Sequence, residues 1–430
     1  MGGGKTSAVL TALDILHLAG SNFLPALVLA PLRVARDVWP YETAEWEHLK
    51  GFSIAPIIGT ERERRYALHR KATIYTMNYE NIPWLIEQCG DRWPFQTVIA
   101  DEATRLKNYR VRKGGERSTA LAKILRKTHR WVNLTGTPSP NGLKDLWGQN
   151  FFIDEGERLG RTYTDFKDRW FTYNPYSRAL TPKEHAEKQI YDRLRDVTLS
   201  VDLRDYCDIK DPFVKPVYVD LPRAVMEKYK ELEIELEVQL NKDEKLTALT
   251  AAALSTKCLQ FAAGAAYHSP DKWAHIHDEK ILALESIVAE TAGAPLLVAY
   301  WWRHDAERIL KAFPKARVLK TKKDEDDWNK GRIEMLLVHP QSAGHGLNLQ
   351  HGGHHLIFLS MWWNLEYNQQ VMERIGPVRQ MQSGYDRMVY HYYIIARNTV
   401  DEQVMERNTE KAEVQTLLLN AMKRRHHAIH

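Results

Sequence analysis

The sequence predicts an α/β protein with two lobes of parallel β-sheet and a mostly helical segment between them. Short apolar runs alternate with helical patterns in the first and last parts of the chain, which is typical of parallel strands buried on both faces. Polar residues such as Asp101-Glu102 directly follow several of these runs, and ligands of open α/β sheets bind at that carboxyl edge. Residues 151–275 instead combine a helical pattern with alternating charges.

The expected elements can be placed in chain order. The first lobe, residues 1–150, should contain the strands Ala26–Ala30, Thr73–Asn78, Val98–Ala100 and Val132–Thr135. The helical insertion, residues 151–275, should contain the helices Arg223–Leu240 and Leu246–Ala263. The second lobe, residues 276–412, should contain the strands Leu296–Tyr300, Met335–His339, Leu356–Ser360 and Val389–Ala396. Residues 413–430 are expected to form the end of a C-terminal helix and a tail.

The composition excludes several classes of protein. With 430 residues, 44% of them hydrophobic and 27% charged, the chain is not a mostly disordered one. Its three cysteines lie far apart, which excludes a disulfide framework and a zinc ribbon and fits a reducing cytoplasm. No apolar run approaches the roughly 18–20 residues of a membrane span, so we expect no membrane partner.

A glycine-rich turn that leads into a helical pattern opens the chain, with the residues Gly2, Gly3, Gly4, Lys5, Thr6 and Ser7. Such a turn lets main-chain N–H groups bind phosphate. Lys5 would reach the β- and γ-phosphates of ATP, and Thr6 would bind Mg²⁺. The first glycine of the complete pattern, and the strand before it, would fall before Met1. An N-terminus that is merely rich in glycine therefore stays an alternative, and we expect the natural protein to begin upstream.

Two carboxylates end the third apolar run of the first lobe. Asp101 can hold Mg²⁺ through water, and Glu102 can orient and deprotonate the attacking water. Such a pair is common at helix starts, so alone it is a weak signal. Combined with the phosphate-binding turn, it predicts hydrolysis of a nucleoside triphosphate.

Several stretches resemble, in order, the motifs of the Swi/Snf-type ATPases of helicase superfamily two. DEATRLKN at 101–108 resembles the DEAH-like motif II with its extension, and LTGTPSPNGLKDLW at 134–147 resembles motif III and its continuation. SAGHGLNL at 342–349 resembles motif V, and the residues from 363 to 374 resemble motif VI. The resemblance spans nearly the whole chain, and ERIGPVRQMQ at 373–382 is most similar to compact phage- or prophage-encoded members.

The resemblance implies two RecA-like lobes with ATP and Mg²⁺ in the cleft between them. It implies catalytic roles for Lys5, Asp101, Glu102, Gln370, Arg374 and Arg379. It implies nucleotide binding by Gly2, Gly3, Gly4, Lys5, Thr6, Ser7 and Gly346, and Mg²⁺ binding by Thr6 and Asp101. Pro377 stands where the family has the second arginine of motif VI, and Arg379 is expected to take over its role.

The resemblance also implies a nucleic-acid track and residues that couple it to the nucleotide. The track would contain Arg33, Arg105, Lys107, Asn108, Trp302 and Arg303. Coupling is implied for Thr135, Thr137 and Asn348. For each basic residue taken singly a solvated surface charge is the alternative, and for the tryptophan it is packing in the core or between the lobes.

The leading functional hypothesis is an ATP-driven translocase on double-stranded or branched DNA. The alternatives are a strand-separating DNA or RNA helicase, and a non-catalytic DNA-binding module, because the chain starts inside the phosphate-binding turn. We expect a monomer in the cytoplasm, that of the bacterial host if the protein is phage-encoded. Phage or host replication and recombination proteins are its expected partners.

The net charge of +5 is unevenly distributed. Residues Ala103–Arg130 contain ten Lys or Arg against one acid, Glu116, which gives +9, so the rest of the chain sums to −4. The stretch begins directly after the Asp-Glu pair. It predicts one basic face for a phosphate backbone and salt-sensitive binding.

Overall fold

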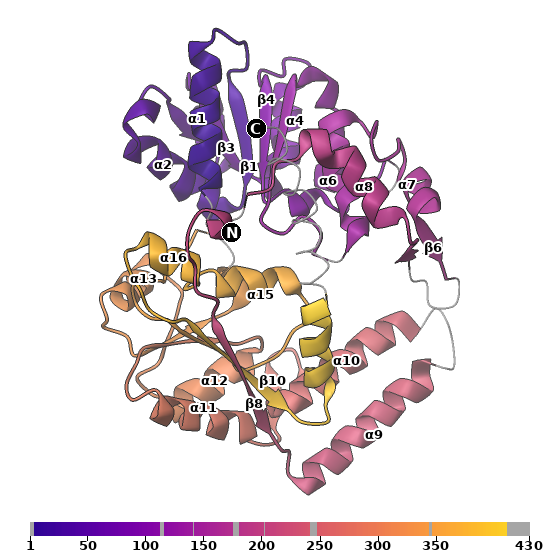
Figure 1. The fold of residues 1–430 in the computed structure, drawn as a ribbon, viewed down its shortest axis with the longest axis vertical. Helices are drawn as coiled ribbons and strands as arrows, with labels where there is room; N and C mark the ends of the chain where they lie inside the picture. The colour runs from indigo at the N-terminus through magenta and orange to yellow at the C-terminus, as the bar shows by residue number, and fades with distance from the viewer. Residues whose placement is uncertain are drawn as a thin grey trace. The chain divides into compact units, whose positions relative to one another are not determined.

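The computed structural model describes residues 4–111, 116–140, 142–174, 180–201, 203–240, 247–343 and 346–410. These residues divide into two compact units, one with the described residues up to 201 and the other with those from 203 to 410. Each unit has its own parallel sheet (Figure 1), which confirms the predicted α/β class with two lobes. Among the described residues, no helix is both long and apolar enough to cross a bilayer.

The first unit contains a five-stranded, fully parallel sheet in the order β2-β3-β1-β4-β5. Its strands are β1 Ala26–Ala30, β2 Ile54–Pro56, β3 Ile74–Asn78, β4 Thr97–Asp101 and β5 Arg130–Leu134. The helices are α1 Lys5–Leu18, α2 Trp39–Glu45, α3 Glu61–His69, α4 Ile82–Cys89, α5 Glu116–Ala122, α6 Leu146–Asp154, α7 Tyr163–Trp170 and α8 Ala186–Leu194. The strands β6 Phe171–Tyr173 and β7 Leu180–Pro182 form a separate antiparallel pair. All four predicted strands are confirmed.

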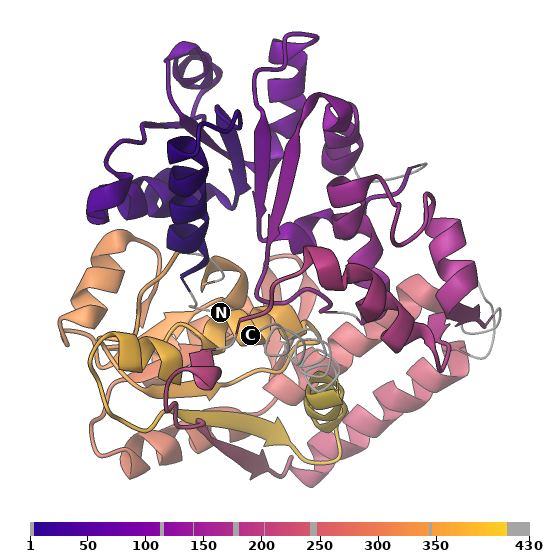
Figure 2. The ribbon, with the colours of Figure 1, turned by 45° about the horizontal axis from the view of Figure 1, so that its top comes forward.

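The two faces of this sheet are covered by different helices, because side chains alternate along a strand. Leu27 and Leu29 of β1 pack in one cluster with α4, α6, α7 and α8, and Ala26 and Val28 pack in the other with α1 and α2. Figures 1 and 2 show α1 beside the strands of this sheet. Both faces are therefore buried, which explains the continuous apolar runs.

The segment 151–275 is divided between the two units, whereas a single helical insertion was expected. Phe152, Phe166, Trp170 and Ile190 are buried in the same cluster as Leu27 of the first sheet. Their aromatic and apolar side chains are spaced to form one face of each helix, and that face packs on the sheet. The residues from 203 onward belong to the second unit.

The second unit contains a six-stranded, fully parallel sheet in the order β12-β13-β11-β14-β15-β8. Its strands are β8 Phe213–Val219, β11 Leu296–Ala299, β12 Arg317–Val318, β13 Met335–Val338, β14 His355–Phe358 and β15 Tyr390–Ala396. The helices are α9 Arg223–Leu240, α10 Thr247–Ala263, α11 Glu279–Glu290, α12 Arg303–Ala312, α13 Lys322–Asn329, α14 Pro340–Ala343, α15 Leu365–Met372 and α16 Pro377–Gln382. Residues 400–410 are also helical, and β9 Ala265–Ser269 pairs antiparallel with β10 Lys272–His275. The four strands predicted here and the helices α9 and α10 are confirmed.

The edge strand β8 comes from the segment that was expected to be helical. It pairs with β15, and the N–H of Phe213 donates to the carbonyl oxygen of Val389. The main-chain groups of alternate residues point to opposite sides of a strand. Since the N–H of Phe213 points toward the β15 side, Pro216, three residues later, faces the open side. A proline there offers no N–H to a further strand, which protects the edge from pairing.

Candidate nucleotide and nucleic-acid sites

The phosphate-binding turn leads directly into α1. Gly4 adopts a left-handed backbone with φ 65°, which glycine tolerates best. The Ser7 hydroxyl donates to the Gly4 carbonyl oxygen at 3.0 Å, and Lys5 and Thr6 lie in the first turn of the helix. Gly2 and Gly3 lie outside the described residues. Main-chain N–H groups at the start of this 14-residue helix are suited to bind an anion.

Asp101 ends β4 at the carboxyl edge of the first sheet and is 6% exposed. Its Oδ2 accepts a hydrogen bond from the Trp39 indole N–H at 3.1 Å. Burial raises the pKa of Asp101, while the positive charge of Lys5, the indole N–H and the N–H of Glu102 oppose that rise. The charge of Lys5 therefore acts on the Asp101 carboxylate, and a cation and a carboxylate at this position are residue types that suit a phosphate with Mg²⁺.

Glu102 begins the turn after β4 in a strained backbone conformation. Its φ of 60° and ψ of 56° are left-handed, which is uncommon for a residue with a side chain. Strain of this kind concentrates at functional sites. The Tyr79 hydroxyl donates to the Asp101 carbonyl oxygen at 2.9 Å, which supports the main chain at this point. This hydrogen bond holds the main chain directly before Glu102.

The predicted coupling residues of the first unit follow β5. The N–H of Thr137 donates to the Thr135 hydroxyl oxygen at 3.0 Å. Thr137 and Ser139 are each 1% exposed, and their hydroxyl groups have no hydrogen-bond partner among the described residues. The Gln149 side-chain amide of α6 donates to the Pro138 carbonyl oxygen. The loop is thus held by Gln149 of α6. The buried hydroxyl groups of Thr137 and Ser139 could make a further hydrogen bond.

The predicted DNA-binding residues of the first unit also lie at the carboxyl ends of strands. Arg33 follows β1, and Arg105, Lys107 and Asn108 follow β4. An Arg105 guanidinium N–H donates to Glu80 Oε1 at 3.4 Å. The main chain of Leu106 and Lys107 packs against Gly148 of α6, which leaves no space for a side chain there.

The basic stretch does not form one face, and that prediction is corrected. Arg126, Lys127 and Arg130 lie at the amino end of β5, whereas Arg105 lies beyond the carboxyl end of β4. The four residue steps along β5 separate the two edges by about 13 Å. Arg126 and Lys127 also pair with carboxylates, at 3.5 Å from Glu155 and 2.9 Å from Asp91. A charge count along the chain cannot distinguish the two edges.

In the second unit, Arg374 is buried and contacts the main chain of its own unit. Its Nε donates to the Gln370 carbonyl oxygen at 3.0 Å, and NH1 donates to the Leu347 carbonyl oxygen at 3.2 Å. Gln370 is fully buried, and its amide donates to Glu366 Oε1 at 3.4 Å. Gln370 lies on α15 and Arg374 in the turn directly after this helix, and the roles of both residues toward ATP stay predictions.

The structure brings Arg379 and Asn348 together. An Arg379 guanidinium N–H donates to Asn348 Oδ1 at 2.6 Å, and burial lowers the pKa of Arg379. Gly346, two residues before Asn348, has a left-handed backbone with φ 68°. Pro377 occupies the first position of α16, where no N–H donor is needed. The proline therefore starts a helix whose first turn presents Arg379 to the motif V loop.

Trp302 and Arg303 lie at the start of α12. The N–H of Trp302 donates to Asp305 Oδ2 at 3.0 Å, so this residue begins the helix. Arg303 already contacts two carboxylates, Asp271 and Glu307, each at 3.0 Å. Contact of either residue with DNA stays a prediction, and for Arg303 it would require exchange of these partners.

Sequence reasoning missed the groups that support Asp101 from other elements. Asn78 ends β3, and Tyr79, Glu80 and Asn81 directly follow it, just as Asp101 ends β4 and Glu102 follows. That shared position after an apolar run was the available signal. The hydrogen bond from the Trp39 indole to Asp101 could be found only in the structure.

A family model and a phage protein both match most of this chain. The sequence model of the SNF2-related domain matches residues 1–257. Protein p41 of Acyrthosiphon pisum secondary endosymbiont phage 1 is 52% identical over 99% of this chain and 94% of its own length. The yeast ISWI chromatin-remodeling complex ATPase ISW2 is 22% identical over 97% of this chain, which spans 38% of ISW2. The solved Sulfolobus solfataricus SWI2/SNF2 ATPase core in complex with dsDNA aligns over 98% of this chain and 87% of its own, with a TM-score of 0.41 and 19% identity.

Proposed function

Since this chain belongs to the SNF2-related family and is an ATPase of helicase superfamily two, we propose that it uses ATP hydrolysis to move along double-stranded DNA. The observation that carries the ATPase half of the proposal is the convergence of Lys5, Asp101 and Glu102 at one edge of the first sheet. There a cation, a buried carboxylate and a strained glutamate lie beside the start of α1.

The residues at this edge have separate roles in the proposal. Lys5 and the N–H groups of the turn bind the phosphates of ATP. Thr6 and Asp101 would hold Mg²⁺, which would neutralise charge on the phosphates. Glu102 orients the attacking water and accepts its proton. Arg374 and Arg379 of the second unit supply positive charge to the γ-phosphate.

The DNA half of the proposal rests on the residues that follow the same edge. Arg33, Arg105 and Lys107 lie at the carboxyl ends of β1 and β4 and would contact backbone phosphates, which position a protein without reading sequence. We place the protein in the cytoplasm of a bacterial host, on double-stranded or branched DNA, with phage or host replication and recombination proteins as its partners.

Two displacement assays test this function. A translocase should release the third strand of a DNA triplex in the presence of ATP, without separating the strands of a matched forked duplex. The Lys5→Ala variant should lose triplex displacement, since it lacks the cation for the phosphates. Efficient separation of the forked duplex would instead favour the strand-separating helicase, and DNA binding without either activity would favour a binding module.

A further inference from the structure

A chain of side-chain hydrogen bonds runs along the carboxyl end of β3 and ends at Arg105. Arg64 donates to Asn81 Oδ1 at 3.1 Å, and Asn81 donates to Asn78 Oδ1 at 2.7 Å. Asn78 then donates to Glu80 Oε2 at 2.9 Å. The other carboxylate oxygen of Glu80 accepts from Arg105 at 3.4 Å. The Glu80 carboxylate is therefore positioned from one side and faces the Arg105 guanidinium on the other.

The contact between Glu80 and Arg105 is weak enough for Arg105 to leave Glu80 and bind another anion. The two side chains are 45% and 34% exposed and share one long contact, so their attraction is weak. Arginine binds phosphate oxygens more strongly when two N–H groups can donate in parallel. A backbone phosphate that approached Arg105 would compete with Glu80 for the same guanidinium.

One buried ring connects this pair to the proposed catalytic edge. The Arg105 guanidinium carbon lies over the Tyr79 ring, 5.6 Å from its centroid. Tyr79 is 1% exposed, and its hydroxyl donates to the Asp101 carbonyl oxygen at 2.9 Å. A rigid side chain thus contacts Arg105 on one side and the Asp101-Glu102 main chain on the other.

We propose that Glu80 occupies the place of a DNA phosphate and that duplex DNA activates hydrolysis by displacing it from Arg105. When the guanidinium moves from Glu80 to the backbone phosphate, Tyr79 transmits the movement to the Asp101-Glu102 turn. Glu80 is a regulatory residue and Tyr79 a positioning residue in this scheme. The inference rests on the proposed function, because it names the step that makes hydrolysis dependent on DNA.

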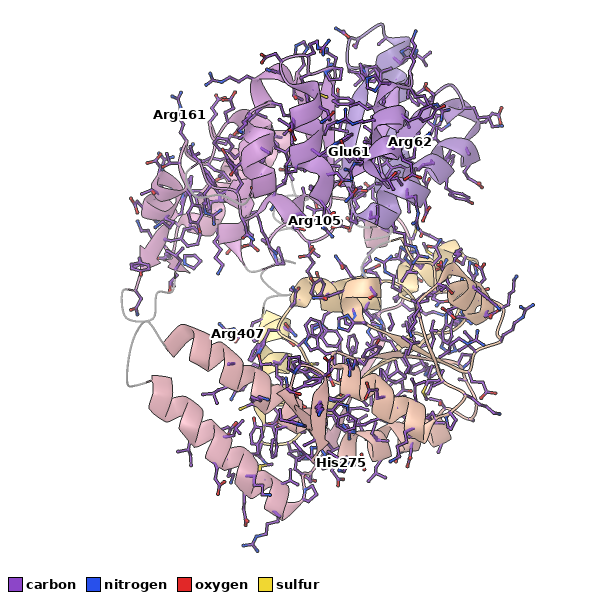
Figure 3. All side chains as sticks on the ribbon, turned by 180° about the vertical axis from the view of Figure 1, so that it is seen from behind. Glu61, Arg62, Arg105, Arg161, His275 and Arg407 are labelled. Carbon is purple, nitrogen blue, oxygen red and sulfur yellow. The ribbon has the colours of Figure 1, made fainter. Side chains whose placement is uncertain are left out.

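The Glu80→Gln variant tests the exchange, with Glu61→Gln as its matched control. Both variants remove one negative charge from the surface of the first unit, but Glu61 pairs with Arg65 at 2.7 Å on α3, whereas Glu80 is the residue that pairs with Arg105. Figure 3 labels Glu61 and Arg105 at separate places on this unit. Fluorescence anisotropy with a short duplex should show about two- to fivefold tighter binding for Glu80→Gln, the factor expected when a weak competing pair is removed. Glu61→Gln should bind nearly as the wild type does. Equal affinities of the two variants would overturn the exchange.

The Tyr79→Phe variant tests the transmission separately. It keeps the ring under Arg105 and removes only the hydroxyl that contacts Asp101. Duplex binding should match that of the wild type, while the ATPase rate at saturating DNA should fall several-fold. An unchanged stimulated rate would refute the role of Tyr79. If duplex DNA did not stimulate the wild type at all, the proposed function would fail, whereas the binding comparison would still decide whether Glu80 competes for Arg105.

Discussion

Replacing Gly148 by alanine should displace the segment that follows the Asp-Glu pair. A Cβ atom at this position would lie 2.5 Å from the Lys107 carbonyl oxygen and 2.7 Å from that of Leu106, where ordinary contact begins at 3.4 Å. These atoms are main chain, so they cannot rotate away. The helix α6 and the segment must separate by about 0.9 Å at the closer atom, and overpacking of this kind costs about 1–3 kcal/mol.

Urea unfolding and DNA-stimulated ATPase rates measure this effect. Gly148→Ala should lower the free energy of unfolding by that amount and reduce the stimulated rate, because the displaced segment carries Arg105. Gly51→Ala is the control, since a Cβ there would meet nothing within 4 Å, and its stability should stay within about 0.5 kcal/mol of the wild type. If both variants had the same stability and rate, the packing of α6 would not hold this segment.

Two further predictions concern buried ionisable residues of the second unit. Lys280 and Asp401 form an ion pair at 2.5 Å with both side chains 1% exposed, so Lys280→Met should cost about 3–5 kcal/mol of stability by leaving a buried carboxylate unpaired. Adding Asp401→Leu should restore part of the lost free energy of unfolding, as measured in denaturant. A double variant less stable than Lys280→Met would contradict this explanation. Burial lowers the pKa of His391 from the ordinary histidine value of 6.5 to about 4. The unfolded chain therefore takes up the proton first as the pH falls, and at pH 5 the loss of stability is about 2 kcal/mol. His391→Phe should flatten the decline of unfolding free energy between pH 7 and 5, and an unaltered slope would show that another group causes it.

The fold was predictable where strands are buried on both faces. The run that became β1 is apolar throughout, and those that became β3 and β4 are mostly apolar and fully buried, so their composition identifies them. The edge strand β5 is only partly buried, and its signal is weaker. The strand β8 was missed because it is an edge strand with Lys215 and Pro216 and mostly exposed side chains. Helical spacing in residues 163–194 predicted helices there but could not show that they cover the first sheet.

The candidate site was predictable only as far as local motifs reach. The glycine turn and the Asp-Glu pair are contiguous in sequence, and the structure brings Lys5 close to Asp101. Trp39 contacts Asp101 from 62 residues away, and Tyr79 from 22 residues away. Such contacts depend on the order of strands in the sheet, which no local pattern specifies.

ATP hydrolysis by the wild type and by Glu102→Gln, each with and without duplex DNA, tests the central claim most directly. The proposed function predicts that duplex DNA raises the wild-type rate, since hydrolysis and movement along DNA are coupled. Glu102→Gln should lose about 10²–10⁴-fold in the stimulated rate, the contribution of a general base. A wild-type rate that is the same with and without DNA, or a Glu102→Gln variant that hydrolyses ATP as fast as the wild type, would contradict the account.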